Sequence, residues 1–532
     1  MADTVANFRT VAVVGAGPTG LYTLHHLLLA PEPLVITVFE AGPLAGVGLP
    51  YSPEAAQATM LANIASIEIP PLSQSYLDWL REQPESILRL YGVDPADLHD
   101  RQFLPRLLLG AWFRDELERM IADAPARGHR VALREAARVT DVAEAGEELR
   151  VTFGTADGEE SLLFSHVVLA TGHDWPEGDR PLAGHFVSPW SGLIEATVPP
   201  LAVGVLGTSL SGIDAAMAIA CQHGQFDAGE MVFRLRPRSE GLHITLMSRQ
   251  GLLPEADFWC PLPYQPLRHV TPEALEREAA MGSDGLLDRL WRLFVAELAA
   301  ADPGYAEALG VAHLSPEGFA EAYFAPRLAA DPFVWAEANL AQVDRNAAAR
   351  RTVGWRYAIL RMHEPMETMV ARLSEQDRLR FESLKRVFID NYAAVPPQSI
   401  RRLLALHRAG CLTVLALGQD YALEHWEGGT RVRSDIGHEM QFAVFVDARG
   451  QRALTGSELP FPGLREKLGS HAGPVPMDAE FALTGVGNGR LYLPAAPYLL
   501  ARLPFVQGIT ASADMGAAVA SAILPDTKAV TV

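Results

Sequence analysis

Cysteine is scarce in this 532-residue chain. Only Cys221, Cys260 and Cys411 occur, and no two of them form a CxxC pair. Cysteines scattered in this way exclude a disulfide framework and argue against a thiol redox centre such as that of a disulfide reductase. They are typical of a reducing compartment, so we expect a cytoplasmic protein whose cysteines behave as small buried side chains.

Long apolar runs and net positive charge are missing too. No run reaches the ~18 apolar residues that a membrane-spanning helix needs, and residues 1–10 lack the basic-then-apolar pattern of a signal peptide. Lysine and arginine total 44 against 64 aspartates and glutamates, which gives a net charge of −20. Such an acidic chain repels phosphate backbones, so we expect no nucleic acid as partner, and the lack of a long apolar run leads us to expect no membrane.

Motifs for metal or nucleophilic catalysis are absent as well. The sequence has no HExxH, no nucleophile elbow and no histidines paired at metal-ligand spacing, and its 16 histidines are dispersed. We therefore expect no metal site, and the catalytic side chains stay unknown. The composition, 49% hydrophobic and 20% charged, is that of a globular protein, and the length indicates two or three domains.

The first forty residues carry a dinucleotide-binding fingerprint in its full βαβ context. An apolar strand, a glycine turn, an apolar helix and a second strand follow one another, and Glu40 ends the second strand. The turn reads Gly15-Ala16-Gly17-Pro18-Thr19-Gly20. Gly15 permits the tight turn, Gly17 lets the backbone approach a pyrophosphate, and Gly20 lets the helix pack on the strand. The helix N-terminus offers N–H groups to the phosphates, and Glu40 can accept hydrogen bonds from ribose hydroxyls.

A second, imperfect fingerprint begins near residue 201. Its turn reads Gly207-Thr208-Ser209-Leu210-Ser211-Gly212, so Ser209 replaces the middle glycine. A serine hydroxyl can still hydrogen-bond a phosphate, although the backbone must lie slightly farther away. The next strand ends in Ser248 and Arg249, which can hold a 2′-phosphate that a carboxylate would repel, so we predict NADPH rather than NADH here. The alternative is an ordinary surface arginine at a strand end.

Each fingerprint is followed by short alternating segments and then by an apolar strand that ends in a small-residue turn. The repetition predicts an α/β protein with two nested Rossmann-like dinucleotide-binding domains. A largely helical region at about 271–408 is inserted in the second domain. It could shape a substrate pocket, cover a cofactor or form a subunit contact in a homo-oligomer, and plain packing on the second domain is an equal alternative.

Four further motifs resemble those of known flavoproteins. They are Phe103-Leu104-Pro105-Arg106, Leu169-Ala170-Thr171-Gly172, the segment 246–254 (LMSRQGLLP) and Asp447-Ala448-Arg449-Gly450. With the two fingerprints they resemble the flavoproteins with two dinucleotide-binding domains, which include flavin-containing and N-hydroxylating monooxygenases. The chain is more closely similar to a bacterial family of FAD/NAD(P)-binding proteins, in which some enzymes oxidise the amino group of aspartate. The resemblance covers nearly the whole chain.

The resemblance implies a cofactor for each fingerprint, FAD at the first and NADPH at the second. It implies an FAD-binding domain whose first part is 1–195 and whose second part is 426–532, with the NADP-binding domain at 196–425. Glu40 should then bind the ADP ribose of FAD, and the other implied contacts with FAD are Asn63, Thr171, Gly172, Thr510 and Asp514. Asn63 is equally well interpreted as a turn asparagine. The last two residues belong to a returning segment whose helix N-terminus would point at the flavin pyrimidine.

The activity that the resemblance implies is that of a monooxygenase. NADPH would reduce the flavin, and a flavin C4a-hydroperoxide formed with molecular oxygen would hydroxylate a small-molecule amine or amino acid. An acidic substrate would need arginines, and the candidates lie in 355–357 and 361–363, where solvated helix faces or ion pairs are the alternative. An NADPH-dependent reductase or dehydrogenase without oxygen insertion, and a non-catalytic flavoprotein redox sensor, remain open alternatives.

Overall fold

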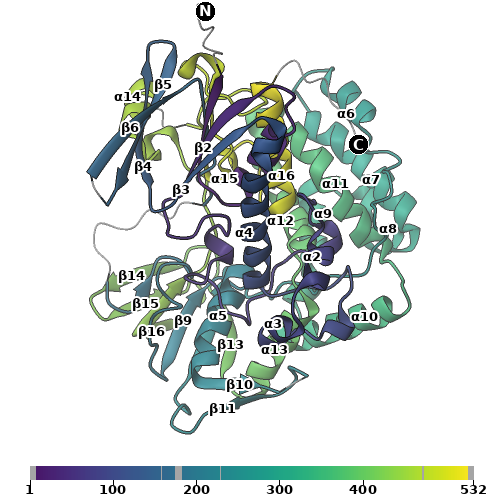
Figure 1. Ribbon diagram of the computed structural model, residues 1–532. Helices are drawn as coiled ribbons and strands as arrows, with labels where there is room; N and C mark the ends of the chain where they lie inside the picture. Colours follow the sequence, from purple (N-terminus) through teal and green to yellow (C-terminus); the bar gives the residue numbers. More distant parts are fainter. Residues whose placement is uncertain (1–7, 157, 174–181, 228, 470–472, 525–532) are drawn as a thin grey trace, which may run out of the picture.

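Two five-stranded sheets form the framework of the computed structural model, which describes residues 8–156, 158–173, 182–227, 229–469 and 473–524 (Figure 1). In spatial order the first sheet consists of β18 (Leu491–Tyr492), β7 (His166–Leu169), β1 (Arg9–Val14), β2 (Leu34–Phe39) and β3 (Arg130–Arg134). The second consists of β13 (Leu412–Ala416), β12 (His243–Ser248), β9 (Ala202–Leu206), β17 (Val444–Asp447) and β8 (His185–Phe186). All pairs within both sheets are parallel.

The two sheets repeat one plan, as the sequence predicts. In each, the strand before the glycine turn lies at the centre and leads into a helix, α1 (Pro18–Leu27) in the first and α5 (Leu210–His223) in the second. In each, a three-stranded antiparallel meander follows later in the chain. The meanders are β4 (Arg138–Ala145), β5 (Glu148–Thr155) and β6 (Gly158–Phe164), and β14 (Ala422–Trp426), β15 (Gly429–Arg433) and β16 (Glu439–Phe442). The predicted α/β fold with two Rossmann-like domains is confirmed.

The second sheet extends beyond the limits predicted for its domain. The strand β17 pairs with β9, and β8 pairs with β17, although the sequence placed both strands in the two parts of the FAD-binding domain. The boundary predicted at 425 falls inside β14 and separates β17 from β9, its partner in the second sheet, whereas β17 belongs to this sheet as β7 belongs to the first. We propose that the second domain reaches back to β8 and forward to the end of β17.

The region between β12 and β13 is helical, as predicted, and flanks both sheets on the right of Figure 1. Its helices are α6 (Pro272–Ala279), α7 (Leu286–Ala301), α8 (Pro303–Leu309), α9 (Pro316–Leu328), α10 (Pro332–Ala348), α11 (Gly354–Val370), α12 (Glu375–Tyr392) and α13 (Pro397–Arg408). Thr271, Ser315 and Ser374 each accept a backbone N–H at a helix start, so these N-caps were readable from the sequence. Aromatic and aliphatic side chains of α7, α9, α11 and α12 form a separate buried cluster inside this region.

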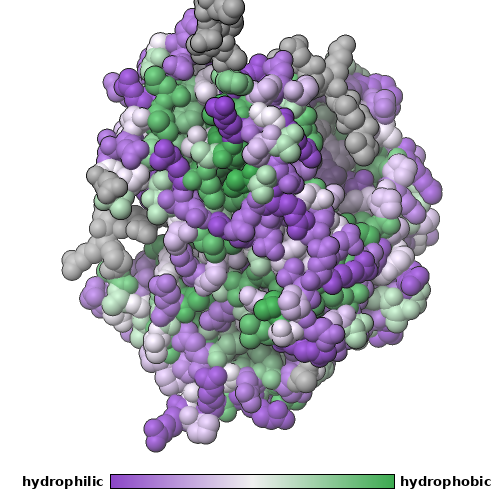
Figure 2. Space-filling model, in the orientation of Figure 1, coloured by the Kyte–Doolittle hydropathy of each residue, from purple (hydrophilic) through white to green (hydrophobic). Residues whose placement is uncertain are grey.

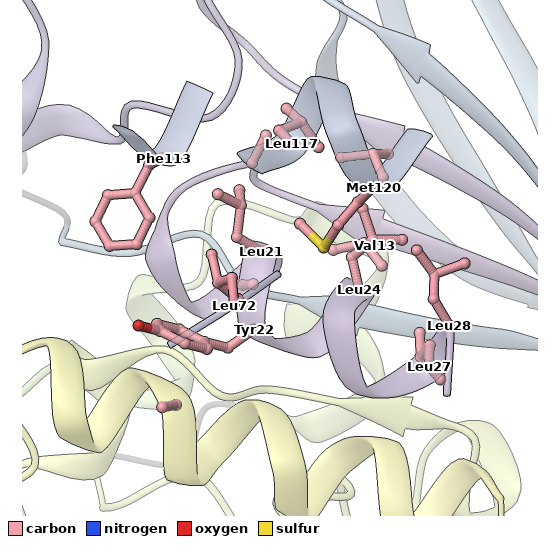
Figure 3. Close-up of a cluster of buried hydrophobic side chains, with 14 of the residues drawn as sticks. Val13, Leu21, Tyr22, Leu24, Leu27, Leu28, Leu72, Phe113, Leu117 and Met120 are labelled. Atoms are coloured by element: carbon pink, nitrogen blue, oxygen red, sulfur yellow. The ribbon is translucent and has the colours of Figure 1, made fainter. Parts of the chain in front are cut away.

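The helix α1 is clamped between two other helices. In Figure 3, Leu21 and Leu24 of α1 face Leu117 and Met120 of α4 (Arg106–Asp123). On the opposite side lies α16 (Ile509–Ile523), where a Cβ at Gly516 would come within 2.7 Å of the Thr23 nitrogen. Packing of this kind fixes the position of the helix N-terminus that follows the first glycine turn.

The other described elements are short: α2 (Tyr76–Glu82), α3 (Glu85–Leu90), α14 (Pro462–Leu468), α15 (Ala496–Leu499), and the hairpin of β10 (Gly224–Phe226) and β11 (Phe233–Leu235). Hydrophilic residues cover most of the face shown in Figure 2, including the outer sides of the helical region. Among the helices of the described ranges, none combines the length and the apolar character needed to cross a membrane.

Candidate functional site

Two glycines of the first turn are required by the fold itself. The Gly15 nitrogen donates to the Phe39 carbonyl at 2.8 Å, and Gly15 has a φ of +99°, where a side chain would be strained. A Cβ on Gly15 would lie 2.2 Å from the Ala170 oxygen, and one on Gly20 would lie 2.0 Å from the Gly15 oxygen. Neither position can carry a side chain without a backbone shift.

Gly17 differs from these two glycines, because a Cβ there would require its neighbour to move by only a few tenths of an ångström. Its nearest contact would be Gly48, whose Cα lies 3.3 Å from the position of a Gly17 Cβ, and its backbone is extended. Gly17 is the N-cap of α1, and among the described residues no side chain caps this helix start. The first-turn N–H groups therefore remain for an anion, as the predicted pyrophosphate site requires. A Cβ at Gly17 would intrude on that approach.

Glu40 is held beside the turn by the backbone. Its Oε2 accepts from the Ala16 nitrogen at 3.2 Å, and its Oε1 accepts from the Gly42 nitrogen at 2.8 Å. Each carboxylate oxygen keeps a further lone pair, so the side chain is oriented while it can still accept from ribose hydroxyls. The geometry suits the predicted role of Glu40.

The C-terminal helix meets the first turn, in the way that the sequence interpretation requires. The Thr19 hydroxyl donates to Ser512 at 3.1 Å, so the starts of α1 and α16 lie together. Gly508 is the N-cap of α16 with a φ of +100°, and no described side chain caps this helix either. Thr510 and Asp514 lie in its first turns. Two uncapped helix starts thus meet at one place, which suits a ligand with negative or electron-rich groups.

The segment after β7 lies close to the first glycine turn, and Asn63 carries a buried polar atom that bears on its predicted role. Thr171 follows Ala170, whose carbonyl touches Gly15, and Gly172 turns the chain with a φ of +70°. The Asn63 Oδ1 atom is buried and has no hydrogen-bond partner among the described residues. A buried amide oxygen without a partner is costly, and a polar ligand group would satisfy it. This fits the interpretation of Asn63 as a flavin contact better than that of an ordinary turn residue.

The second turn repeats the contacts of the first. The Gly207 nitrogen donates to the Met247 carbonyl at 2.7 Å, and a Cβ on Gly207 would lie 2.4 Å from the Ala448 oxygen. A Cβ on Gly212 would lie 2.3 Å from the Gly207 oxygen, just as a Cβ on Gly20 would lie against the Gly15 oxygen in the first turn. Ser209 takes the N-cap position of Gly17, and its hydroxyl does not cap α5. The second turn therefore has the shape of a phosphate-binding turn, with Ser209 at its mouth.

A cavity of about 330 Å³ opens at this second turn. Thr208, Ser209, Ser248 and Arg249 line one side of it, and the Ser248 hydroxyl accepts from the Gly251 nitrogen at 3.0 Å. The opposite side comes from the helical region, chiefly α12, and includes Arg386. The sequence analysis brought together the four fingerprint residues and missed the contribution of α12, because nothing in a helical pattern states which face meets a distant strand end.

A buried ion pair joins the two nucleotide-binding domains. The Arg106 Nη2 lies 2.8 Å from the Asp214 Oδ2, both side chains are at most 10% exposed, and Asp214 belongs to α5. The Arg106 Nε also donates to the Leu61 carbonyl at 3.1 Å, two residues before Asn63. Burial raises the pKa of Asp214, and the Arg106 charge opposes that rise. The FLPR motif was noted in the sequence only as a family signature, whereas its arginine fixes the second nucleotide helix against the first domain.

The two arginine candidates of the helical region have different surroundings. Arg356 is buried, pairs with Glu255 at 3.3 Å and donates to the Ala256 carbonyl, so it serves the structure as an ion pair. Arg361 lies over the Tyr264 ring, 4.4 Å from its centroid, and its Nε is buried without a partner among the described residues. The Arg356 Nε is likewise buried without a partner among the described residues, but the other guanidinium nitrogens of Arg356 bind Glu255 and the Ala256 carbonyl. Arg361 pairs instead with the exposed Glu364 of its own helix, so it is the better candidate for binding a ligand.

Tyr264 connects Arg361 to an acid of the first domain. The Tyr264 hydroxyl donates to the Glu68 Oε1 at 2.8 Å. Arg361 lies 3.5 Å from Glu364 on the same helix. Burial, followed by the negative charge of Glu364, raises the pKa of Asp514 in α16. Glu68, Tyr264 and Arg361 are called the polar cluster below. The helix α11, which carries Arg361, also contacts the chain just before α16, because the His363 ring centroid lies 5.8 Å from that of Phe505.

Comparison with known proteins gives family matches for two parts of the chain. Residues 12–174 match the family model described as FAD-NAD(P)-binding, and residues 271–392 match the model described as YdhS-like middle domain. The uncharacterized protein YdhS of Escherichia coli (strain K12) is 49% identical over 525 residues, which cover 97% of both chains. The first match confirms the predicted binding of FAD and NAD(P), and the second coincides with the predicted helical insertion.

Solved structures show the same architecture at low sequence identity. The reduced form of ornithine hydroxylase (PvdA) from Pseudomonas aeruginosa is 10% identical with a TM-score of 0.50, and the match covers 98% of this chain and 100% of that one. The ornithine N-hydroxylase KtzI of Kutzneria sp. 744 is 15% identical with a TM-score of 0.49, over 98% and 100% of the two chains. The first of these likenesses supports the fold of a flavoprotein with two dinucleotide-binding domains.

Proposed function

The chain belongs to the family of the Escherichia coli protein YdhS, and we propose that it is an FAD- and NADPH-dependent monooxygenase that hydroxylates the amino group of an amine or amino acid. One observation carries the proposal. Two phosphate-binding turns with the same contacts occur in one chain, one beside Glu40 and the other beside Arg249, and the buried pair of Arg106 and Asp214 fixes them relative to each other. Such an arrangement suits the transfer of electrons from one bound dinucleotide to another.

The residues around the first turn fit FAD. Gly17 and the uncapped start of α1 would hold the pyrophosphate, Glu40 would hold the ribose, and Asn63 would use its unpartnered oxygen on the ring system. The start of α16, with Thr510, would favour negative charge on that ring. When bound, FAD supplies the electron transfer from NADPH and the activation of oxygen. The chain itself supplies position and electrostatic field, and no described side chain has to act as a nucleophile.

The polar cluster supports an amino acid as the substrate. A free amino acid carries a carboxylate and an amino group, and the cluster presents a guanidinium and a carboxylate about one tyrosine ring apart. Arg361 would hold the substrate carboxylate with its planar donor fork, and Glu68 would attract the ammonium group. Ornithine hydroxylase of Pseudomonas aeruginosa, which shares the fold, is by its name an enzyme that hydroxylates an amino acid, and this too supports the proposal.

The test is a screen of amino acids and simple amines for stimulation of NADPH oxidation by the purified flavoprotein. The proposal predicts that a substrate speeds NADPH oxidation and that mass spectrometry finds a product heavier by one oxygen. Faster NADPH oxidation with peroxide as the sole product, for every compound tried, would instead favour a reductase or dehydrogenase. No stimulation and no reduction of the flavin would favour a redox sensor.

The role of the polar cluster is tested with Arg361→Gln. We expect the KM for the substrate to rise about 10- to 100-fold, the loss expected for a hydrogen bond to a charged group, while reduction of the flavin by NADPH without substrate is unchanged. Arg372→Gln is the matched control, because Arg372 follows the same helix and pairs with Glu276 at the surface. An unchanged KM in Arg361→Gln would exclude this arginine from substrate binding.

A further inference from the structure

Two arginines from distant parts of the chain meet at the cavity beside the second turn. Arg249 follows β12, and Arg386 lies on α12 of the helical region, so 137 residues of sequence separate them. Both line the cavity together with Ser209 and Ser248. The Arg386 guanidinium donates to the side chain of Gln250, the residue after Arg249, so Arg386 reaches the segment that carries Arg249.

The positive charge of these arginines is not neutralised by an ion pair. In the described part of the chain, neither of them has a carboxylate oxygen within 4.0 Å. Asp390 also lines the cavity, but the Tyr323 hydroxyl donates to it at 2.7 Å and Arg327 pairs with it at 2.5 Å. Partial burial, followed by the like charge of Arg249, lowers the pKa of Arg386, and the charge of Asp390 opposes this. In a chain with a net charge of −20, these two arginines line one cavity without a carboxylate partner.

The position of the pair within the Rossmann-like domain indicates which ligand group it would meet. The turn and the start of α5 face a pyrophosphate, whereas the residue after the second strand faces the adenosine ribose. Arg249 holds that second position, and Arg386 is bonded to its neighbour Gln250 rather than to the turn. An anion of charge near −2 at the ribose would satisfy both guanidinium groups, each through paired hydrogen bonds.

We propose that Arg386 and Arg249 together bind the 2′-phosphate of NADPH, so that the helical region completes the coenzyme site and sets its preference for the phosphorylated coenzyme. The inference rests on the proposed function for the assignment of the second turn to a nicotinamide coenzyme. It gives the helical region a role that the fold of two Rossmann-like domains does not require. Loss of one cation should leave the other to bind the phosphate alone, with lower affinity.

The experiment uses the purified full-length flavoprotein and two probes, 2′,5′-ADP and 5′-AMP, which differ only in the 2′-phosphate. Dissociation constants are measured by isothermal titration calorimetry for the wild type, Arg386→Gln and Arg386→Lys. We expect Arg386→Gln to weaken the binding of 2′,5′-ADP about 10- to 100-fold and to leave the binding of 5′-AMP unchanged. Arg386→Lys keeps the charge without the planar donor fork, so its dissociation constant for 2′,5′-ADP should lie between those of the wild type and Arg386→Gln. Bound flavin and melting temperature establish that each variant is folded.

Arg378→Gln is the matched control, since Arg378 is exposed on the same helix and does not line the cavity. The proposal is overturned if Arg386→Gln binds both probes as the wild type does, or if it weakens both equally, which would assign Arg386 to the shared part of the coenzyme. Because the titrations involve neither oxygen nor an amine, they give their answer even if the chain proves to be a reductase. A failure of hydroxylation and a failure of this inference are therefore distinguishable.

Discussion

Replacement of Gly17 by alanine separates cofactor binding from folding in the first domain. The added Cβ would lie 3.3 Å from the Gly48 Cα, a tight contact that a shift of a few tenths of an ångström relieves, and the extended backbone of Gly17 accepts any residue. The fold should therefore tolerate Gly17→Ala. By contrast, alanine at position 15 would place its Cβ 2.2 Å from the Ala170 oxygen and would disturb the backbone at the carboxyl end of the central strand.

The expected loss of FAD affinity follows from the position of the new methyl group. It would occupy the approach of the pyrophosphate to the uncapped start of α1 and push the phosphates out of hydrogen-bonding range. Loss of two hydrogen bonds to a charged group, at about 1.5–3 kcal/mol each, amounts to about 3–6 kcal/mol. This corresponds to an increase of about 10²- to 10⁴-fold in the dissociation constant of FAD.

The assay is the visible absorbance of flavin per protein after purification, followed by titration of flavin-free protein with FAD. Gly473→Ala is the control, because Gly473 has open space around its Cβ position and no unusual φ. We expect Gly17→Ala to lose bound FAD and to keep the melting temperature of the flavin-free wild type. Gly473→Ala should keep its bound FAD and the melting temperature of the wild type. Full flavin content in Gly17→Ala would refute the placement of the pyrophosphate at this turn.

Three further predictions concern charged residues. Arg249→Ala should weaken the binding of NADPH more than that of NADH, by about 1–3 kcal/mol, in titrations of the two coenzymes. An equal loss of affinity for both coenzymes would argue against phosphate recognition at Arg249. Arg106→Gln leaves Asp214 buried without its partner, so the free energy of unfolding in urea should fall by about 3–5 kcal/mol, and a fall below about 1 kcal/mol would contradict the importance of this pair. Burial, followed by the charge of Glu68, raises the pKa of Asp257 to about 7. Since the native state prefers the protonated acid, the unfolding free energy should decline as the pH rises from about 4 to about 7, and Asp257→Asn should reduce that decline.

Much of the fold could be predicted because its signals are local. The turn at Gly15 and the turn at Gly207 each lie between an apolar strand and an apolar helix, and the structure gives them the same contacts. The helix starts at Thr271, Ser315 and Ser374 were readable for the same reason, since the capping residue stands beside the helix that it caps.

The features that the sequence analysis missed are contacts between distant segments. The strand β17 pairs with β9, so the repeated plan assigned it to the correct half of the chain, whereas the predicted boundary at 425 separated it from its sheet. Arg106 meets Asp214, and Arg386 meets Gln250, across more than 100 residues of chain. An arginine held in a buried ion pair and one proposed to bind a ligand have the same local sequence pattern, and only their neighbours in space separate Arg356 from Arg361.

The central claim is that one chain holds FAD and a nicotinamide coenzyme so that electrons pass between them. The most direct measurement is the anaerobic addition of NADPH to the purified protein while the flavin absorbance is followed. We predict a yellow protein whose flavin is bleached by one equivalent of NADPH and regains its colour when oxygen is admitted. The account would be contradicted by a protein that stays colourless after incubation with FAD. It would also be contradicted if the protein binds flavin but NADPH does not reduce that flavin.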